Sequence, residues 1–265
     1  MYPLDASHKQ RLEEIADVFL IPDPAQKMDM MVGQEIRDRV LRWVRGPEIL
    51  EMGGGDGRWT VEIIKRFGHS SVVDGSGRLL QDLKATFGDK VNCHESFFEN
   101  FVPPGDLLFN TVIATHVLEH LHDPVAVLRR SQHWLAPDGR MILVVPNATS
   151  VHRRVGVKMG YLKTVYDLSE RDVTIGHQRV YDLETLKAHA LAAGYTIVHA
   201  QGFQLKIVSL AMMANFPEPL FKALFDIGDE LPPEMTSDIG LVLEIMAGHC
   251  PSEPVTNMCE PRASR

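Results

Sequence analysis

The chain has 265 residues, of which 45% are hydrophobic and 23% charged, and its acids outnumber its bases 35 to 27. This acidic balance argues against a general affinity for nucleic acid, whose phosphates need a basic surface. The three scattered cysteines, Cys93, Cys250 and Cys259, form neither a disulfide framework nor a paired metal motif, so we expect a cytoplasmic protein.

Residues 1–45 are expected to form a helical lid or brace. Apolar residues recur there at helical spacing in two stripes, which Pro22 and Pro24 separate. Charged residues interrupt the first twenty positions, and no later apolar run approaches the ~20 residues that a membrane span needs. We therefore expect neither export nor insertion into a membrane.

Residues 46–249 are expected to form one α/β domain. Seven short apolar runs predict strands, at 49–52, 71–74, 91–94, 111–114, 141–145, 196–199 and 241–246. Amphipathic segments between them predict helices, at 59–67, 78–87, 124–135 and 183–193. This alternation predicts a Rossmann-like, doubly wound, mostly parallel seven-stranded sheet with helices on both faces, in addition to the N-terminal helical lid.

Turn residues mark the ends of these elements. Asp123 and Pro124 are suited to start a helix, since the carboxylate accepts an unpaired amide and proline lacks one. Glycines 68, 88 and 194 stand where helices are expected to stop. Two segments fall outside the pattern, 147–181 and 203–238, and we interpret them as walls of a substrate pocket. Residues 250–265 are expected to be a disordered tail.

The strongest motif is a glycine-rich turn between the first strand and the helix that follows it. It places Glu51 two positions before Gly53, and Gly55 and Gly57 follow at alternate positions. A dinucleotide fingerprint would need a third glycine where Arg58 stands. The spacing instead resembles the first motif of class I methyltransferases, in which the acidic residue faces the cationic amino-acid end of S-adenosylmethionine.

The resemblance implies where the rest of this cofactor lies. Asp74 and Gly75 end the second strand, and the carboxylate of Asp74 is expected to accept both ribose hydroxyls. Ser96 and Phe97 follow the third strand, where this family binds adenine, with Ser96 at a position that often holds Asp. His116, after the fourth strand, is expected to line the methionine part of the cofactor.

Further segments resemble the methyltransferase group that includes ubiquinone-biosynthesis enzymes. They are the segment 110–124 with its Leu118-Glu119-His120 sequence, the turn 135–140, the strand end 144–147 and the segment 176–181. The likeness covers about 48–203. It implies methyl transfer from S-adenosylmethionine to a small biosynthetic molecule, with S-adenosylhomocysteine as the product, and it leaves the acceptor and the oligomeric state open, a homodimer being one option.

The sulfonium already activates the methyl group, so the protein mainly has to align the acceptor and exclude water. A hydroxyl acceptor also needs its proton removed, and histidine is the natural base near neutral pH. We expect O-methylation with His120 or His177 as the catalytic base. N-methylation of an amine needs no dedicated base and is the alternative.

His116, Glu119 and His120 have the i, i+3, i+4 spacing that places metal ligands on one face of a helical turn. Some relatives hold a divalent ion with a Glu-x-x-Glu-His set, in which His116 here replaces the first Glu. Because of this replacement we expect no metal.

The basic stretch His152-Arg153-Arg154, with two later lysines, is either a solvated helix face or a grip for an acidic acceptor. Two functions of other classes are also considered: an NAD(P)-dependent oxidoreductase, which Arg58 opposes, and a cofactor-binding module without catalysis.

Overall fold

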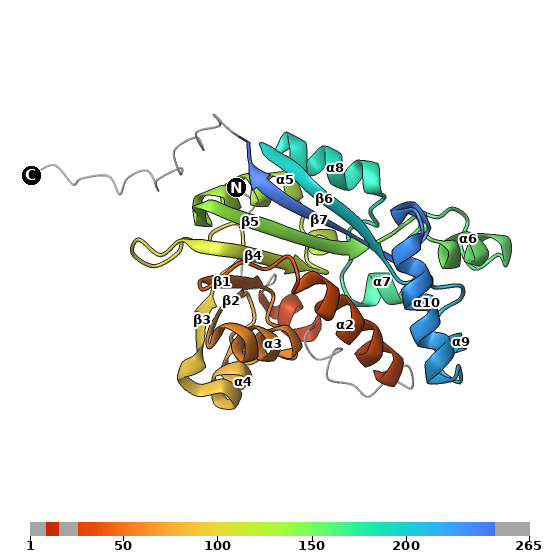
Figure 1. Cartoon of the computed structure of the whole chain (residues 1–265), viewed down its shortest axis with the longest axis horizontal. Helices are drawn as coiled ribbons and strands as arrows, with labels where there is room; N and C mark the ends of the chain where they lie inside the picture. Colours follow the sequence, from red (N-terminus) through yellow and green to blue (C-terminus); the bar gives the residue numbers. More distant parts are fainter. Residues whose placement is uncertain (1–8, 16–25, 247–265) are drawn as a thin grey trace, which may run out of the picture.

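A computed structural model of the chain describes residues 9–15 and 26–246. Its described part contains one seven-stranded sheet with the strand order β3-β2-β1-β4-β5-β7-β6 (Figure 1). The strands are β1 (Ile49–Met52), β2 (Ser70–Asp74), β3 (Val91–Glu95), β4 (Phe109–Thr115), β5 (Leu135–Pro146), β6 (Tyr195–Phe203) and β7 (Asp238–Ile245). The first five strands are parallel, and β7 runs antiparallel to β5 and β6. All seven predicted strands are confirmed.

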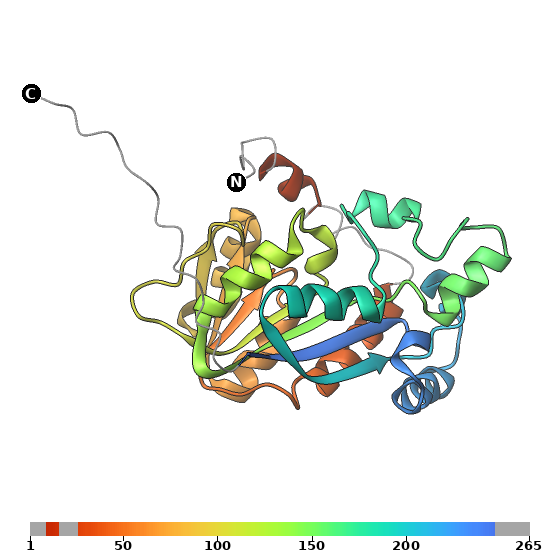
Figure 2. The same ribbon diagram turned by 90° about the horizontal axis from the view of Figure 1, so that it is seen from above.

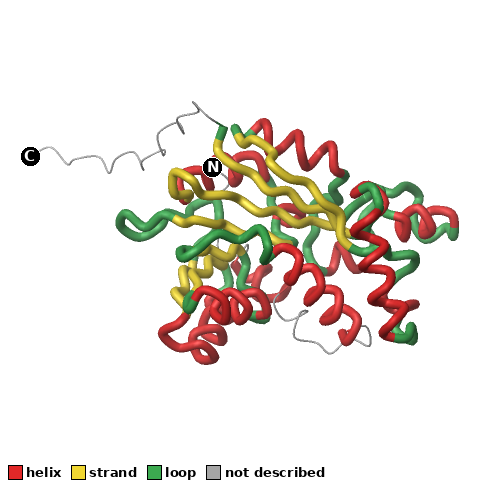
Figure 3. The backbone as a smooth tube through the Cα atoms, viewed as in Figure 1, coloured by secondary structure: helices red, strands yellow, loops and turns green. Residues whose placement is uncertain are grey.

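Helices cover both faces of the sheet (Figures 2 and 3). The buried side chains of α5 (Pro124–Ser131) and α8 (Leu183–Ala192) belong to the largest core cluster, with Leu50 and Val112. On the other face, α2 (Gln26–Val40), α3 (Arg58–Phe67) and α10 (Glu218–Glu230) pack against residues such as Ile113 and Ile142. Every residue of β1 is buried because both faces are covered, which explains its continuous apolar run.

The predicted helix 124–135 is too long. The α-helix ends at Ser131, a 3₁₀ turn, η3 (Gln132–Trp134), follows, and β5 already begins at Leu135. Leu135 already pairs with Phe109 of β4, and the register then shifts before Arg140 pairs with Thr111. Within this irregular stretch a Cβ on Gly139 would lie 2.7 Å from the carbonyl oxygen of Phe109. Backbone this close leaves no room for a side chain.

The helix ends predicted at three glycines are confirmed. Gly68 and Gly88 follow α3 and α4 (Gly77–Phe87) with φ angles of 91° and 58°, and Gly194 has a φ of 89°. These positive angles favour glycine. At the start of α5, the Asp123 carboxylate accepts from the N–H of Ala126 at 2.9 Å. A further 3₁₀ segment, η1 (Gly88–Lys90), leads into β3.

The two segments outside the βα pattern carry their own helices. Residues 147–181 contain α6 (Val151–Lys158) and α7 (Glu170–Thr174), and residues 203–238 contain α9 (Leu210–Met213), α10 and the 3₁₀ segment η4 (Pro233–Met235). The helical residues 9–15 and α2 lie on opposite sides of the sheet (Figure 2). The predicted break at Pro22 and Pro24 and the predicted tail 250–265 lie outside the described residues. Within the described part of the chain, no helix has both the length and the apolar character to cross a membrane.

Candidate functional site

The strand order reverses between β1 and β4, since the chain winds outward to β3 and then returns to place β4 beside β1. In open α/β sheets, ligands bind in the crevice outside the carboxyl ends of the strands at such a point. The residues predicted to bind the cofactor stand at or just beyond the carboxyl ends of β1, β2, β3 and β4, with Glu51 inside β1, and the candidate base His120 also follows β4. The topology therefore gathers them at one edge of the sheet.

The glycine-rich turn begins as β1 ends. The N–H of Gly53 donates to the carbonyl of Val73 at 2.9 Å, which ties the turn to β2. Gly53, Gly55 and Gly57 all have positive φ angles, of 79°, 48° and 78°. A Cβ at Gly55 would meet no atom within 4 Å, so the turn is open on that side. The helix that follows has no side-chain cap at Gly57, which leaves amides at its N-terminus for a ligand.

Glu51 lies in β1 beneath this turn, on the sheet face that α3 covers. It is buried, and its Oε2 accepts from the hydroxyl of Thr60 in α3 at 2.6 Å. Burial, with the nearby carboxylates of Asp74 and Asp56 adding to its effect and the Thr60 hydrogen bond opposing it, raises the pKa of Glu51 to about 8. In the absence of a ligand, the carboxyl is therefore mostly protonated at pH 7. A cationic group beside it would stabilise the ionised form.

Asp74 ends β2 and holds the turn in place. Its Oδ2 accepts from the N–H of Gly54 at 2.9 Å, and its Oδ1 accepts from the N–H of Ser76 at 2.8 Å. Burial raises its pKa, although these two amides oppose the shift. Each carboxylate oxygen keeps a further lone pair, which can accept from a ligand hydroxyl.

The end of β3 packs beside Asp74. The N–H of Ser96 donates to the carbonyl of Asp74 at 3.0 Å, and its hydroxyl donates to the carbonyl of Phe97 at 3.0 Å. The ring of Phe97 lies 3.3 Å from the position that a Cβ on Gly75 would take, so only glycine leaves the ring this close to the backbone. Phe97 thereby offers an apolar surface next to the carboxylate of Asp74.

The described N-terminal residues 9–15 contact the same edge. Glu13 accepts from the hydroxyl of Ser76 at 2.7 Å, and Lys9 pairs with Glu95 at the end of β3. A Cβ on Gly75 would lie 2.6 Å from Leu12, and one on Gly176 would lie 2.6 Å from Ile15. The segment thus spans from the β2 and β3 ends to residue 176, which lies in the first insertion.

Beyond β4 the chain turns sharply into η2 (Leu118–His120). His116 has a φ of 54°, which is unusual for a residue with a side chain, and its N–H donates to the carbonyl of Val144 at 2.8 Å. Its half-exposed ring lies between two carboxylates, with Nδ1 3.5 Å from Glu119 and Nε2 3.7 Å from Asp238. These contacts place the imidazole between η2 and the start of β7.

Glu119 is fully buried, and neither of its carboxylate oxygens has a hydrogen-bond partner among the described residues. Burial by itself would raise its pKa, but the contacts with His116 and the charges of His120 and His177 outweigh this and hold the pKa below its usual value. The N–H of Gln178 donates to the Glu119 carbonyl at 2.7 Å, which anchors the first insertion against η2. Glu119 is therefore a buried anion surrounded by imidazoles.

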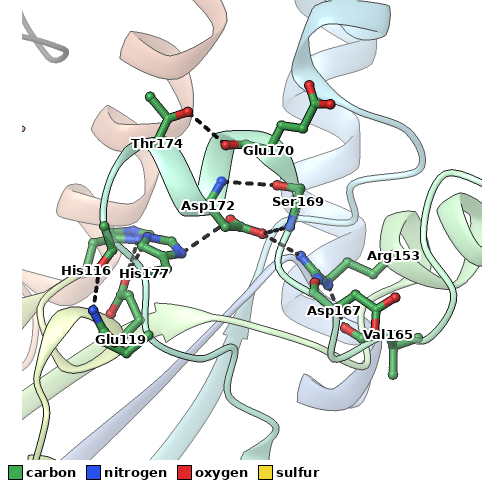
Figure 4. Close-up of polar contacts among 12 residues, drawn as sticks. His116, Glu119, Arg153, Val165, Asp167, Ser169, Glu170, Asp172, Thr174 and His177 are labelled. Atoms are coloured by element: carbon green, nitrogen blue, oxygen red, sulfur yellow. Dashed lines mark hydrogen bonds and ion pairs between the residues drawn. The ribbon is translucent and has the colours of Figure 1, made fainter.

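His177 is held between two carboxylates, as Figure 4 shows. Its Nδ1 lies 3.3 Å from Asp172, and its Nε2 lies 3.9 Å from Glu119. Asp172 also pairs with Arg153 at 3.5 Å and accepts from the N–H of Ser169 at 2.8 Å. Burial would raise the pKa of Asp172, but His177 and the Ser169 amide hold it well below its usual range. These contacts fix the orientation of the His177 ring.

His120 differs from His177 in its surroundings. It is half-buried, its ring centroid lies 4.7 Å from that of His177, and the two planes are nearly perpendicular, at 82°. Burial lowers its pKa, with the Glu119 charge opposing this shift and the neighbouring imidazoles adding to it. His120 is thus neutral near pH 7, as a proton acceptor must be.

The structure brings the two candidate bases His120 and His177 together, and it adds Glu119 to them. Ligand atoms of these three residues lie within 4.8 Å of one another. The buried carboxylate of Glu119 and the two imidazoles form a donor set that fits a divalent ion. The predicted i, i+3, i+4 set also included His116. His116 contacts Glu119 but is not a member of the set formed by Glu119, His120 and His177.

Two residues of the site were not predicted. Asp172 comes from the first insertion and Asp238 begins β7, and the local signal for Asp172 is its place in the Ser169-x-x-Asp172 capping box of α7. Arg153 corrects the interpretation of the basic stretch, because it is buried and bonded to Asp172 and to the carbonyl of Val165 rather than exposed to solvent or to an acceptor.

Comparisons with known proteins agree with this geometry. A family model described as a methyltransferase domain matches residues 26–200. A comparison with curated proteins gives no match.

The chain is similar to three solved structures at identities that show a common fold alone. The methyltransferase in a complex with the Trm112 methyltransferase activator of Haloferax volcanii is 14% identical, over 85% of this chain and 94% of that chain, with a TM-score of 0.59. The 1,6-didemethyltoxoflavin-N1-methyltransferase of Burkholderia thailandensis, with bound S-adenosylhomocysteine, is 16% identical over 93% and 91%, with a TM-score of 0.55. The N-methyltransferase NodS of Bradyrhizobium japonicum, also with S-adenosylhomocysteine, is 15% identical over 90% and 98%, with a TM-score of 0.53.

Proposed function

Because the chain belongs to the methyltransferase-domain family, we propose that it methylates a hydroxyl oxygen of a small biosynthetic intermediate in the cytoplasm. It is an S-adenosylmethionine-dependent methyltransferase of the small-molecule type, and S-adenosylhomocysteine is its product. The observation that supports the choice of oxygen is the position of His120 just beyond the end of β4, with its ring 4.7 Å from that of an oriented His177, where burial lowers its pKa.

We assign the cofactor to the crevice over β1, β2 and β3. The turn of Gly53, Gly55 and Gly57 would carry the methionine part, with Glu51 facing its ammonium. Asp74 would accept from the ribose hydroxyls. The adenine would lie on Phe97 beside Gly75, recognised at its edge by backbone amides near Ser96, since the Ser96 hydroxyl already donates to a carbonyl. His116 would border the sulfonium side.

The protein then has to bring the acceptor into line with the methyl group and the departing sulfur. The oxygen lone pair forms the new bond to the methyl carbon as the carbon–sulfur bond breaks. The electron pair of the broken bond stays on sulfur. His120 would take the hydroxyl proton as this bond forms. His177 would act as a positioning residue, because Asp172 and Glu119 fix its ring. The segments 147–181 and 203–238 would wall the acceptor pocket.

We further propose that residues 1–45 act as a lid on the methyltransferase domain formed by residues 46–249, with residues 250–265 as a tail. The contacts of Glu13 with Ser76 and of Leu12 with Gly75 support this, since they lie over the proposed ribose and adenine positions. A closed lid would exclude water from the reacting atoms.

N-methylation is a second candidate, because two of the similar structures are N-methyltransferases. An uncharged amine attacks through its own lone pair and can lose its proton to solvent afterwards. In that case the histidines would shape the pocket without taking part in proton transfer.

The donor set of Glu119, His120 and His177 supports a second version of the O-methylation proposal, in which a metal ion assists the reaction. A divalent ion bound there would lower the pKa of an acceptor hydroxyl, so that a weaker base suffices. Asp172 would then orient His177 as a ligand through its Nδ1 contact.

The test is transfer of labelled methyl from S-adenosylmethionine to a panel of phenols, aliphatic alcohols and amines. We expect label on hydroxyl compounds, and for the best of them we expect His120→Gln to lower kcat about 100-fold or more, the range of general-base catalysis. His122→Gln, at an exposed histidine two residues later, is the matched control. Labelling confined to amines, with full turnover of His120→Gln, would reject O-methylation.

A further inference from the structure

The side chain of Arg179 holds the turn that carries His120. Its Nη1 donates to the carbonyl of Leu118 at 3.4 Å and also to the carbonyl of Leu121, and its Nη2 donates to the carbonyl of His122 at 3.1 Å. One of these carbonyls precedes His120 and two follow it. Basic side chains commonly bind the carbonyls at the end of a helical turn. Arg179 thus fixes the backbone on both sides of the candidate base.

The residues just before Arg179 contact the same turn. The N–H of Gln178 donates to the carbonyl of Glu119 at 2.7 Å, and the ring of His177 lies against the ring of His120, with their centroids 4.7 Å apart. Three consecutive residues therefore reach the turn, through a ring, a backbone amide and a guanidinium. Because they are joined by short peptide units, the bonds made by Gln178 and Arg179 also set where the two imidazoles lie relative to each other.

A guanidinium suits this task better than other basic groups. Its donors point in fixed directions within one plane, so Arg179 can reach three carbonyls together only when the turn has the right shape. A lysine ammonium is a point charge on a flexible stem and imposes less geometry. Arg179 is also half-buried, which limits competition by water for the carbonyls. Its contacts therefore shape the turn as well as attach it.

We propose that Arg179 is a positioning residue for methyl transfer, which fixes η2 so that His120 and His177 keep the relative placement that the reaction needs. This inference rests on the proposed function, in which His120 takes the proton of the acceptor hydroxyl. The carbonyls that Arg179 binds belong to residues 118, 121 and 122, none of which is assigned to the cofactor. Loss of Arg179 should therefore slow the reaction without weakening the cofactor.

The first test measures the placement of the two rings and needs no acceptor. NMR spectra of the full chain with isotope-labelled histidine are compared for the wild type and for Arg179→Met, whose side chain has no donors. Because each ring shifts the resonances of the other, we expect the signals of His120 and His177 to move, while that of His69, at the opposite end of the strands, stays in place. His120→Gln and His177→Gln identify the two signals. Unmoved signals from both rings would overturn the proposal.

The second test measures the reaction, with the hydroxyl compound of the acceptor panel that the wild type methylates fastest. We expect Arg179→Met to lower kcat about 100-fold, as misplacement of a catalytic group by about 1 Å can do, and to change KM for that compound and Kd for S-adenosylhomocysteine less than about threefold. Arg179→Lys should lower kcat only about tenfold. Arg129→Met is the matched control, because Arg129 also donates to a backbone carbonyl, that of Ala192 at 3.0 Å, away from the site.

A double substitution shows whether Arg179 acts through His120. Adding Arg179→Met to His120→Gln should lower kcat less than about threefold further, because a base that is absent cannot be misplaced. A further loss of about 100-fold would overturn the proposal, as would an Arg179→Met protein with the kcat of the wild type or with weakened binding of S-adenosylhomocysteine. Full turnover of His120→Gln would be a different result, since it would reject the base role in the proposed function, while the NMR spectra would still decide whether Arg179 places the rings.

Discussion

Lowering the pH should weaken cofactor binding through Glu51. Its pKa is raised to about 8 by burial, by Asp74 and by Asp56, so the unliganded carboxyl holds a proton at pH 7. The proposed role of Glu51 is to face the ammonium of the cofactor, and a positive charge at that position favours the carboxylate. Binding is therefore expected to release this proton. The perturbation is the pH, and Glu51→Gln, which cannot ionise, is the matched variant.

The magnitude follows from the shift. Suppose that the bound cofactor returns the pKa of Glu51 toward the ordinary 4.5. Compared with a protein whose Glu51 is already ionised, removal of the proton then lowers the affinity about tenfold at pH 7 and about 100-fold at pH 6, or by about 1.4 kcal/mol per pH unit. The sign for stability follows too. Because the folded-state pKa lies above the unfolded value, Glu51 contributes stability below pH 4.5 that is lost as the pH rises through about 8.

The assay is isothermal titration of S-adenosylhomocysteine between pH 6.0 and 7.5, repeated in buffers with different ionisation enthalpies. We expect the wild type to release nearly one proton per ligand at pH 7.0 and to lose affinity about tenfold per unit below it. Glu51→Gln should show neither effect. Equal proton release by both proteins, or affinity in the wild type that does not change with pH, would refute the reasoning.

Three further changes test the site. Asp74→Asn leaves the N–H of either Gly54 or Ser76 without an acceptor and removes a charged partner of the ribose. Calorimetry should therefore show that S-adenosylhomocysteine binds about 10- to 100-fold more weakly. Unchanged affinity would contradict the ribose assignment. Glu13→Gln weakens the contact with Ser76, so stopped-flow displacement should show faster release of S-adenosylhomocysteine, whereas an unchanged rate would argue against the lid. Dialysis against a chelator should leave kcat unchanged if a histidine is the base; loss of activity that Mg²⁺ or Mn²⁺ restores would instead favour the divalent-ion form of the proposal.

The residues proposed to bind the cofactor could be chosen from the sequence because their signals are local. Glu51, the glycines and Asp74 each stand at the end of an apolar run, and strand ends of a parallel sheet meet at one edge. The seven strands were predictable for the same reason, since burial on both faces leaves continuous apolar runs. The start of β5 could not be predicted. Its first residue, Leu135, pairs with β4 ahead of a register shift that includes Gly139, and the periodicity of the sequence does not reveal such a shift.

The acceptor side was only partly predictable. His120 and His177 were predicted separately, but the contact between their rings depends on how the first insertion folds back onto η2 through Gln178. Asp172 stands in a segment without strand or core pattern, so only tertiary structure places it beside His177.

The most direct test of the account is a crystal structure of the chain with S-adenosylhomocysteine. The account predicts one ligand across the ends of β1, β2 and β3, with its ribose hydroxyls on Asp74, its adenine against Phe97 and its sulfur open toward His120. A ligand bound elsewhere on the chain, or these strand ends left empty at saturating ligand, would contradict it.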